Sequence, residues 1–386
     1  MPMTITILYL HIFLISKYII RFVDQIYLAV ALFLSFWLII YVFRRRLEKY
    51  NLTVYPFFIL WRKKSREYWF PKFSRSKGYR AYEKIALPIG FLLMIAGIVT
   101  ILYIIIEMLT IKPNQTPTIA LKPIIPGVTI SISQLPYILL AIGVSVAIHE
   151  IFHALSATSN NVKVKNGGVL LLGIFPGAFV EPDEDDFNKS TSNAKLKIIA
   201  AGIVINLVLA LIALPLSFEL PYLPSALSQG IIIEGVLNNT PAANASLHTG
   251  DIIYSINGYR LTTLSQLHEL LYNYSTITIT LKHPNGSLSN VSVNIPNHFL
   301  GVYVTYYIPD YIAAILMFFT WLFIVNFSLA VFNAAPLIIT DGGKLLTELL
   351  KRMLGESNGE KISYYLQSLF LLIFIFAIFL SNRPLG

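Results

Sequence analysis

Six apolar stretches dominate the sequence, and each is long enough to cross a membrane as a helix. A transmembrane helix needs about 20 predominantly apolar residues. Only 13% of the residues are charged, whereas a soluble domain carries about a quarter. Residues 3–15 are also apolar, and the sequence leaves open whether they form a signal-like segment, an interfacial helix or a further short span. We therefore expect a polytopic α-helical membrane protein with about six transmembrane helices, at 26–43, 85–109, 135–157, 195–218, 311–335 and 362–381.

The basic residues are concentrated in one loop. Residues 44–84 carry 13 Lys or Arg against three Glu, and such loops stay on the cytoplasmic side of a membrane. A basic loop between two apolar stretches indicates membrane orientation rather than a nucleic-acid surface, so we expect the lipid bilayer as a partner and no nucleic acid. We therefore expect a multi-pass protein of the cell membrane. Alternation of its spans places the segment 219–310 on the extracytoplasmic side.

The segment 219–310 reads as a small α+β domain inserted between two spans. Gly250–Gly258 predicts a strand between two turns, 264–272 has helical periodicity, and 276–282 with 288–295 predicts a hairpin. This order resembles a PDZ domain, and another small α+β domain is the alternative. The resemblance implies a groove beside Gly230, Ile231 and Ile232 that could bind a peptide C-terminus by strand addition.

One short motif carries chemistry. His149, Glu150 and His153 form a His-Glu-x-x-His pattern inside the third apolar stretch. Residues four apart share a helix face, so the two imidazoles can hold one zinc ion while Glu150 takes a proton from a metal-activated water. Ionisable groups inside a span are costly unless they pair, bind metal or meet water. The alternative is a polar cluster that hydrogen-bonds neighbouring helices.

A catalytic zinc site usually has three protein ligands, and the chain has no cysteine. The best third ligand is Asp341, because the third and fifth spans run in the same direction and would bring it to the depth of the histidines. Pro336 would break the fifth span just before Asp341. Taken alone, Asp341-Gly342 could instead be a plain turn at the end of that span.

These motifs together resemble the site-2 protease family of intramembrane zinc metalloproteases. The resemblance runs from about 135 to 345 and includes the stretch from Asn333 to Gly342. It implies one zinc per chain bound by His149, His153 and Asp341, a water activated by Glu150, and membrane-protein substrates cleaved within a transmembrane helix on the cytoplasmic side. Two departures are Thr340, where the family often has Leu, and Gly202-Ile-Val-Ile-Asn206, which lacks the family's proline.

Further residues are candidates for binding the substrate. The glycines and prolines between Gly167 and Gly177 favour a β-hairpin, which the resemblance places at the membrane near the zinc. An edge strand there could hold an unwound substrate segment. Asn206 and Asn333 could donate amide hydrogen bonds to the same segment, although intramembrane Asn also commonly joins helices.

These expectations divide the chain into four parts. They are 1–134, with two spans and the basic loop; 135–218, the first part of a catalytic membrane core; 219–310, the extracytoplasmic domain; and 311–386, the second part of the core. Two other functions stay open. A membrane metal transporter or sensor would be expected to carry acidic or His residues in several spans, and a catalytically silent adaptor of the same fold would be expected to have lost members of the motif.

Overall fold

The computed structural model describes residues 27, 30–111, 117–123, 125, 128–218 and 222–383. Within them, five helical segments are long and apolar enough to cross a membrane, and Val30–Val42 is a shorter apolar helix. The sixth predicted span, 26–43, corresponds to this shorter helix and lies partly outside the described residues, so the expected count of six stays a prediction. The separate apolar segment 3–15 lies wholly outside them. The five segments are Lys77–Thr110 (α4), Ile132–Ser159 (η2 and α5, Leu135–Ser159), Ser192–Leu216 (α7, Ser192–Ala213, and η3), Asp310–Phe332 (α11) and Glu356–Ser381 (α13).

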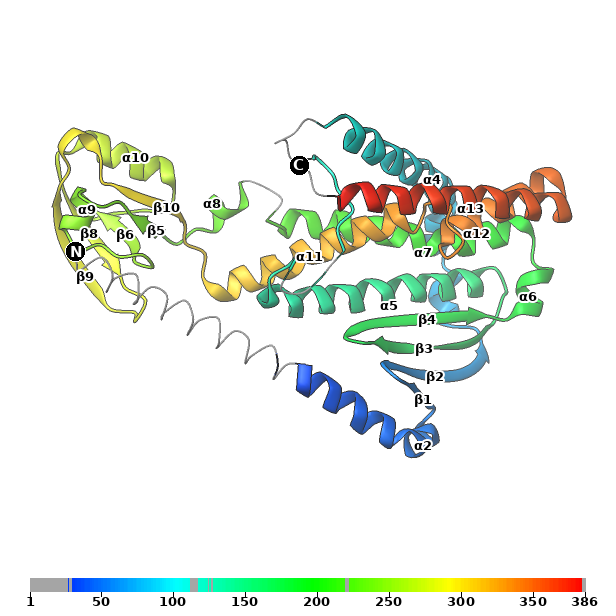
Figure 1. Cartoon of the computed structure of the whole chain (residues 1–386). Helices are drawn as coiled ribbons and strands as arrows, with labels where there is room; N and C mark the ends of the chain where they lie inside the picture. The colour runs from blue at the N-terminus through cyan, green and yellow to red at the C-terminus, as the bar shows by residue number, and fades with distance from the viewer. Residues whose placement is uncertain are drawn as a thin grey trace. The chain divides into compact units, whose positions relative to one another are not determined.

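The chain forms two compact units. The first contains a four-stranded antiparallel sheet in the order β1-β2-β3-β4, whose strands lie side by side in Figure 1. Its strands are β1 (Leu52–Tyr55), β2 (Phe58–Glu67), β3 (Val164–Leu172) and β4 (Phe175–Pro182). Strands β3 and β4 are the hairpin that the glycines and prolines predict. Short helices flank the sheet in sequence: α2 (Arg44–Leu47), η1 (Glu48–Tyr50), α3 (Pro71–Ser74) and α6 (Glu184–Lys189).

The prediction that 44–84 is a loop is wrong for its middle part. Residues 52–67 form β1 and β2, and β2 pairs with β3 from Phe58↔Leu172 to Lys64↔Asn166. Gly168 permits this close pairing, because a Cβ there would lie 1.9 Å from the carbonyl oxygen of Trp61. The high charge of the segment hid its strand pattern, since the cations occupy one end of β2 and the apolar residues the other.

The second unit contains the inserted α+β domain. Its sheet has the order β10-β5-β6-β8-β9, with β7 pairing β6. Alternating side chains of β8, including Ile277 and Ile279, are fully buried in its core, as expected for a strand with one buried face. The strand, helix and hairpin predicted between 250 and 295 are present, whereas β10 was not predicted, and the likeness to a PDZ domain stays a prediction. The elements are α8 (Leu223–Leu227), β5 (Ile231–Val236), α9 (Pro241–Asn244), β6 (Ile252–Ile256), β7 (Tyr259–Arg260), α10 (Leu264–Asn273), β8 (Thr276–Lys282), β9 (Leu288–Asn294), η4 (Pro296–His298) and β10 (Val302–Tyr306).

The stretch after α11 differs from its predicted geometry. The helix ends at Phe332, before Pro336, and Asp341 is the first residue of a new helix, α12 (Asp341–Leu354). Asp341 is therefore separated from the fifth span, and the alternative of a plain turn at the end of that span is wrong. Thr340 explains the change, because its Oγ1 accepts the N–H of Gly343 at 3.3 Å. A threonine in this position caps a helix, which gives a physical use for the residue that departs from the family pattern.

Candidate metal centre

His149 and His153 project from one face of α5 and converge. Their Nε2 atoms lie 3.0 Å apart, and the two rings meet edge to face. Two imidazole nitrogens that bind the same tetrahedral zinc ion stand about 3.3 Å apart, because each lies about 2.0–2.1 Å from the ion. The pair is therefore close to the spacing that a shared zinc ligand set requires.

The other ring nitrogen of His153 is held by α7. Its Nδ1 lies 2.7 Å from the carbonyl oxygen of Ile198. A carbonyl oxygen can only accept, so Nδ1 donates the proton and Nε2 keeps a lone pair on the side of the ring that faces His149. A backbone partner that fixes the tautomer in this way is usual for a metal-binding histidine.

Gly202 makes room for the same ring. A Cβ built at Gly202 would lie 2.2 Å from Nε2 of His153, which no real side chain tolerates. The sequence singled out Gly202 only through its departure from a family motif. The structure gives it a role: it lets the α7 backbone approach the imidazole.

Asp341 is 5% exposed and is oriented by its own neighbours. The Asn333 side-chain amide donates to Oδ2 of Asp341 at 3.1 Å, and the backbone N–H of Asp341 donates back to Asn333 at 3.3 Å. Lys344 lies 2.9 Å from Oδ1. Asn333, predicted as a candidate substrate ligand, therefore contacts the carboxylate of Asp341.

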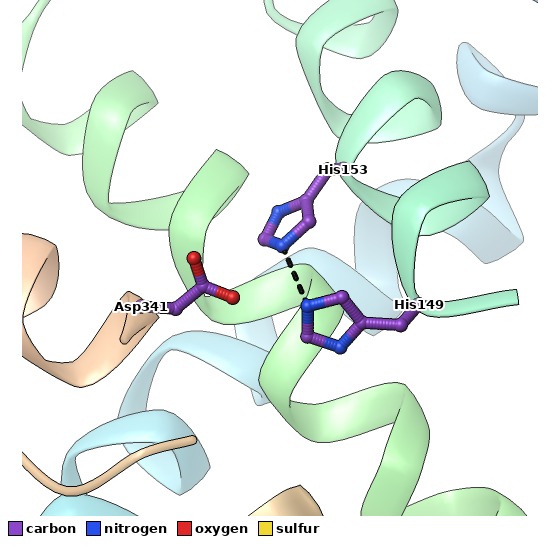
Figure 2. Close-up of side chains that lie close together, drawn as sticks. All are labelled: His149, His153 and Asp341. Atoms are coloured by element: carbon purple, nitrogen blue, oxygen red, sulfur yellow. Dashed lines mark hydrogen bonds between the residues drawn. The ribbon is translucent and has the colours of Figure 1, made fainter. Parts of the chain in front are cut away.

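The three candidate ligands form one group. One nitrogen each from His149 and His153 and one carboxylate oxygen from Asp341 lie within 4.8 Å of one another, and Figure 2 shows the three side chains directed toward a common point. Imidazole nitrogen with carboxylate oxygen is a donor set that suits zinc. The residues present fit the metal that the sequence motif predicts.

Glu150 faces the hairpin. Its Oε2 accepts the backbone N–H of Val180 at 2.8 Å. Strand β4 is the edge of the four-stranded sheet, so this N–H belongs to the outward side of the edge. The candidate base and the edge strand are thus in direct contact, which sequence spacing alone could not reveal.

Sequence reasoning also missed a buried acid. Glu83 on α4 is 2% exposed and accepts hydrogen bonds from Ser156, Ser159 and Asn160 at the end of α5. The only signal was a glutamate among the basic and aromatic residues at the start of the second span. Glu83 stabilises the turn of α5 that follows His153.

The structure leaves one of the remaining site predictions open and contradicts the other. Asn206 is fully buried on α7, and its role stays a prediction. Strand β5, in contrast, is paired on both sides across Ile231 and Ile232, with β10 at Tyr306 and Thr305 and with β6 at Ile253 and Ile252. A peptide strand therefore cannot add beside Gly230, Ile231 and Ile232, and that part of the sequence prediction is wrong.

Several apolar helices, a His–His–Asp group and an adjacent glutamate define a membrane protein with a candidate zinc centre. Residues 137–376 match the family described as Peptidase family M50, and the chain belongs to that family.

Three relatives widen the comparison. An uncharacterized protein of Methanocaldococcus jannaschii is 29% identical over 372 residues, which cover 94% of this chain and 93% of that protein. The membrane-bound transcription factor site-2 protease homolog of Arabidopsis thaliana is 26% identical over 52% of this chain and 40% of its own length. A protein of Clostridium acetobutylicum whose name describes it as a zinc metalloprotease is 30% identical over 40% of this chain and 52% of its own length. The aligned part of this chain thus spans about half or less of the two relatives named for protease activity.

Proposed function

We propose that this protein is an intramembrane zinc endopeptidase that hydrolyses peptide bonds in the transmembrane segments of other membrane proteins. The observation that carries the proposal is the group of His149, His153 and Asp341, with donor atoms within 4.8 Å of one another. Membership of Peptidase family M50 supports the reaction class.

Each residue has a role in this proposal. His149, His153 and Asp341 hold one zinc ion per chain, which when bound lowers the pKa of a water and polarises the substrate carbonyl. Glu150 accepts the proton of the attacking water and delivers it to the leaving amine. Asn333 and the carbonyl oxygen of Ile198 orient Asp341 and His153, respectively. Asn206 is proposed as a further hydrogen-bond donor near the substrate.

The outward edge of β4 is proposed to hold the substrate backbone. A transmembrane helix satisfies its own backbone hydrogen bonds, so a segment must unwind and find new partners before water can attack it. Every second residue of an edge strand directs its backbone N–H and C=O away from the sheet. Because the N–H of Val180 points outward, the residues of β4 with outward backbone groups are 176, 178, 180 and 182. Pro176 and Pro182 have no N–H, and the N–H of Val180 donates to Glu150. Ala178 is therefore the outward N–H that the edge offers to a substrate strand.

The proposed location follows from charge. From the basic residues of 44–84 we propose that the histidines lie on the cytoplasmic side of the cell membrane and the inserted domain on the opposite side. Zinc-dependent hydrolysis of the peptide bond would then take place near the cytoplasmic face, on substrates embedded in the same bilayer.

The test uses the purified full-length protein in lipid nanodiscs with a single-span test substrate. Glu150→Gln should bind as much zinc as the wild type and cleave at least about a hundredfold more slowly, because general base catalysis contributes about 10²–10⁴-fold. Glu184→Gln, at an exposed acid on α6, is the matched control and should cleave normally. Wild-type rates for Glu150→Gln would exclude it as the base, and zinc binding without cleavage by the wild type would favour a transporter, sensor or adaptor.

A further inference from the structure

The four-stranded sheet is apolar at one end and cationic at the other. Strand β2 begins Phe58-Ile-Leu-Trp61 and continues with Arg62, Lys63, Lys64 and Arg66. The apolar part pairs with residues 169–172 of β3. Trp61 is 40% exposed, and Val169 and Leu172 are 52% and 56% exposed, so this end presents apolar surface.

The length of the apolar end matches one leaflet. Four residues of strand extend about 13 Å at 3.3 Å per residue, close to half of the roughly 30 Å hydrocarbon core. Insertion of this end would bring the boundary between Trp61 and Arg62 to the level of the lipid headgroups. Tryptophan is enriched at that level.

The cationic end contains an open pocket of about 500 Å³. Its lining includes the cations Arg62, Lys64, Arg66 and Lys165, with Glu181 as its acid. Gly168 leaves Arg62 room to extend across the sheet toward Phe179, with the guanidinium 5.7 Å from the ring. The pocket is therefore formed by side chains of β2, β3 and β4 together.

The charges in this pocket are not balanced. Arg66 pairs with Asp183 at 3.0 Å, and the backbone N–H of Asp186 and the charge of Arg66 lower the pKa of Asp183, which keeps that carboxylate ionised. Glu181 accepts from Asn166 and lies 3.6 Å from Arg62. The four cations thus face two acids.

Among the described residues, three donors of this pocket have no acceptor from the protein. Within the part of the chain that the structure describes, Lys64 and Lys165 form no ion pair. In the same part, Nε of Arg62 is buried without a hydrogen-bond partner. A buried donor without an acceptor is costly, and an anion in the pocket would remove this cost.

We propose that this pocket binds the phosphate headgroup of an anionic phospholipid. The guanidinium of Arg62 and the amine of Lys64 match a phosphate, and the exposed apolar surface beyond Trp61 suits an acyl chain of the same molecule. An acidic peptide would satisfy the cations but would leave that apolar surface unused.

The experiment measures lipid retention by native mass spectrometry of the full-length protein in detergent. The lipids are phosphatidylglycerol and phosphatidylcholine of equal chain length. The wild type should retain phosphatidylglycerol in preference. Arg62→Gln/Lys64→Gln should weaken this binding roughly 30-fold, about fivefold for each cation. Lys49→Gln/Lys72→Gln removes two exposed cations of the same basic segment outside the pocket and should change it less than twofold.

A third variant tests the charge argument with the opposite sign. Glu181→Gln keeps an acceptor for Asn166 and removes the acid, so phosphatidylglycerol should bind about fivefold more tightly. This gain cannot come from misfolding. Unchanged binding by Arg62→Gln/Lys64→Gln, or an equal loss in the Lys49→Gln/Lys72→Gln control, would overturn the proposal. Equal competition by glycerol 3-phosphate would assign the pocket to free phosphate instead, and equal competition by a Glu-rich peptide would make it a peptide site.

Discussion

At the scale of single residues, the geometry of the candidate metal centre depends on two residues that bind no metal. Gly202 admits the imidazole of His153, and Asn333 orients the carboxylate of Asp341. Partners of this kind usually change metal affinity 10- to 100-fold when they are replaced. The two residues therefore give tests of the site that leave all three candidate ligands in the chain.

Gly202→Ala should reduce zinc binding at least about tenfold. The added methyl group would lie 2.2 Å from Nε2 of His153, so the ring or α7 must move and the nitrogen loses its position. Zinc per chain, measured by elemental analysis after dialysis against a weak chelator, checks this. Gly78→Ala is the matched control, because a Cβ there meets nothing within 4 Å. Full zinc content in Gly202→Ala would show that His153 binds no metal in this rotamer.

Asn333→Ala should weaken zinc binding about 10- to 100-fold while Asp341→Ala weakens it further. The alanine removes the amide that holds Oδ2 of Asp341 but leaves the carboxylate itself. Competition with a chelator of known affinity measures the difference. Asn285→Ala, in an exposed turn of the inserted domain, should bind zinc as the wild type does. An affinity unchanged by Asn333→Ala would mean that Asp341 needs no orientation or is not a ligand.

At the scale of elements, the edge strand β4 is proposed to bind the substrate backbone, and this role can be tested at one residue. Ala178→Pro should lower cleavage about tenfold or more without changing zinc content, because it removes the outward N–H proposed to bind the substrate. Ala178→Gly retains that N–H and should cleave at a rate near the wild type. The cleavage rates of the two variants, measured on one test substrate in nanodiscs, test whether the substrate uses this N–H. Equal rates would show that the substrate backbone does not use Ala178.

The elements also show what the sequence could and could not predict. Motifs with local spacing were enough to predict the candidate site residues His149, Glu150, His153 and Asp341. The membrane spans follow from the length and hydropathy of the apolar stretches. Strand β2 was missed because its pairing partner lies about 100 residues away and its charges resemble a loop. The pairing of β5 was misjudged for the same reason, since β10 comes about 70 residues later. Contacts that are distant in the sequence leave no periodic signal in either segment.

At the scale of the whole molecule, the inserted domain can be removed cleanly. Its first and last residues are hydrogen-bonded to each other: the N–H of Gln229 donates to the carbonyl of Tyr307 at 2.9 Å, and that of Tyr307 donates to the carbonyl of Gly230 at 2.9 Å. A short Gly-Ser linker can therefore replace 230–306 without stretching the chain. A boundary at 295, where the predicted hairpin ends, would leave β10 without its partner β5.

Because the proposed topology puts this domain on the side of the membrane opposite the zinc, we expect it to select substrates rather than take part in hydrolysis. Replacing 230–306 by the linker should leave zinc content and cleavage of a short test substrate within about twofold of the wild type, since no proposed ligand or base lies in that segment. The preference in kcat/KM for short substrates over substrates with a bulky extracytoplasmic domain should fall toward one, because a folded domain on that side of the membrane would exclude bulky partners by its volume. The control inserts the same linker at the turn of Asn285 and Gly286, which keeps the domain and should keep the preference. An unchanged preference in the deletion would make the domain a spacer, and loss of all cleavage would show that it holds α11 in place.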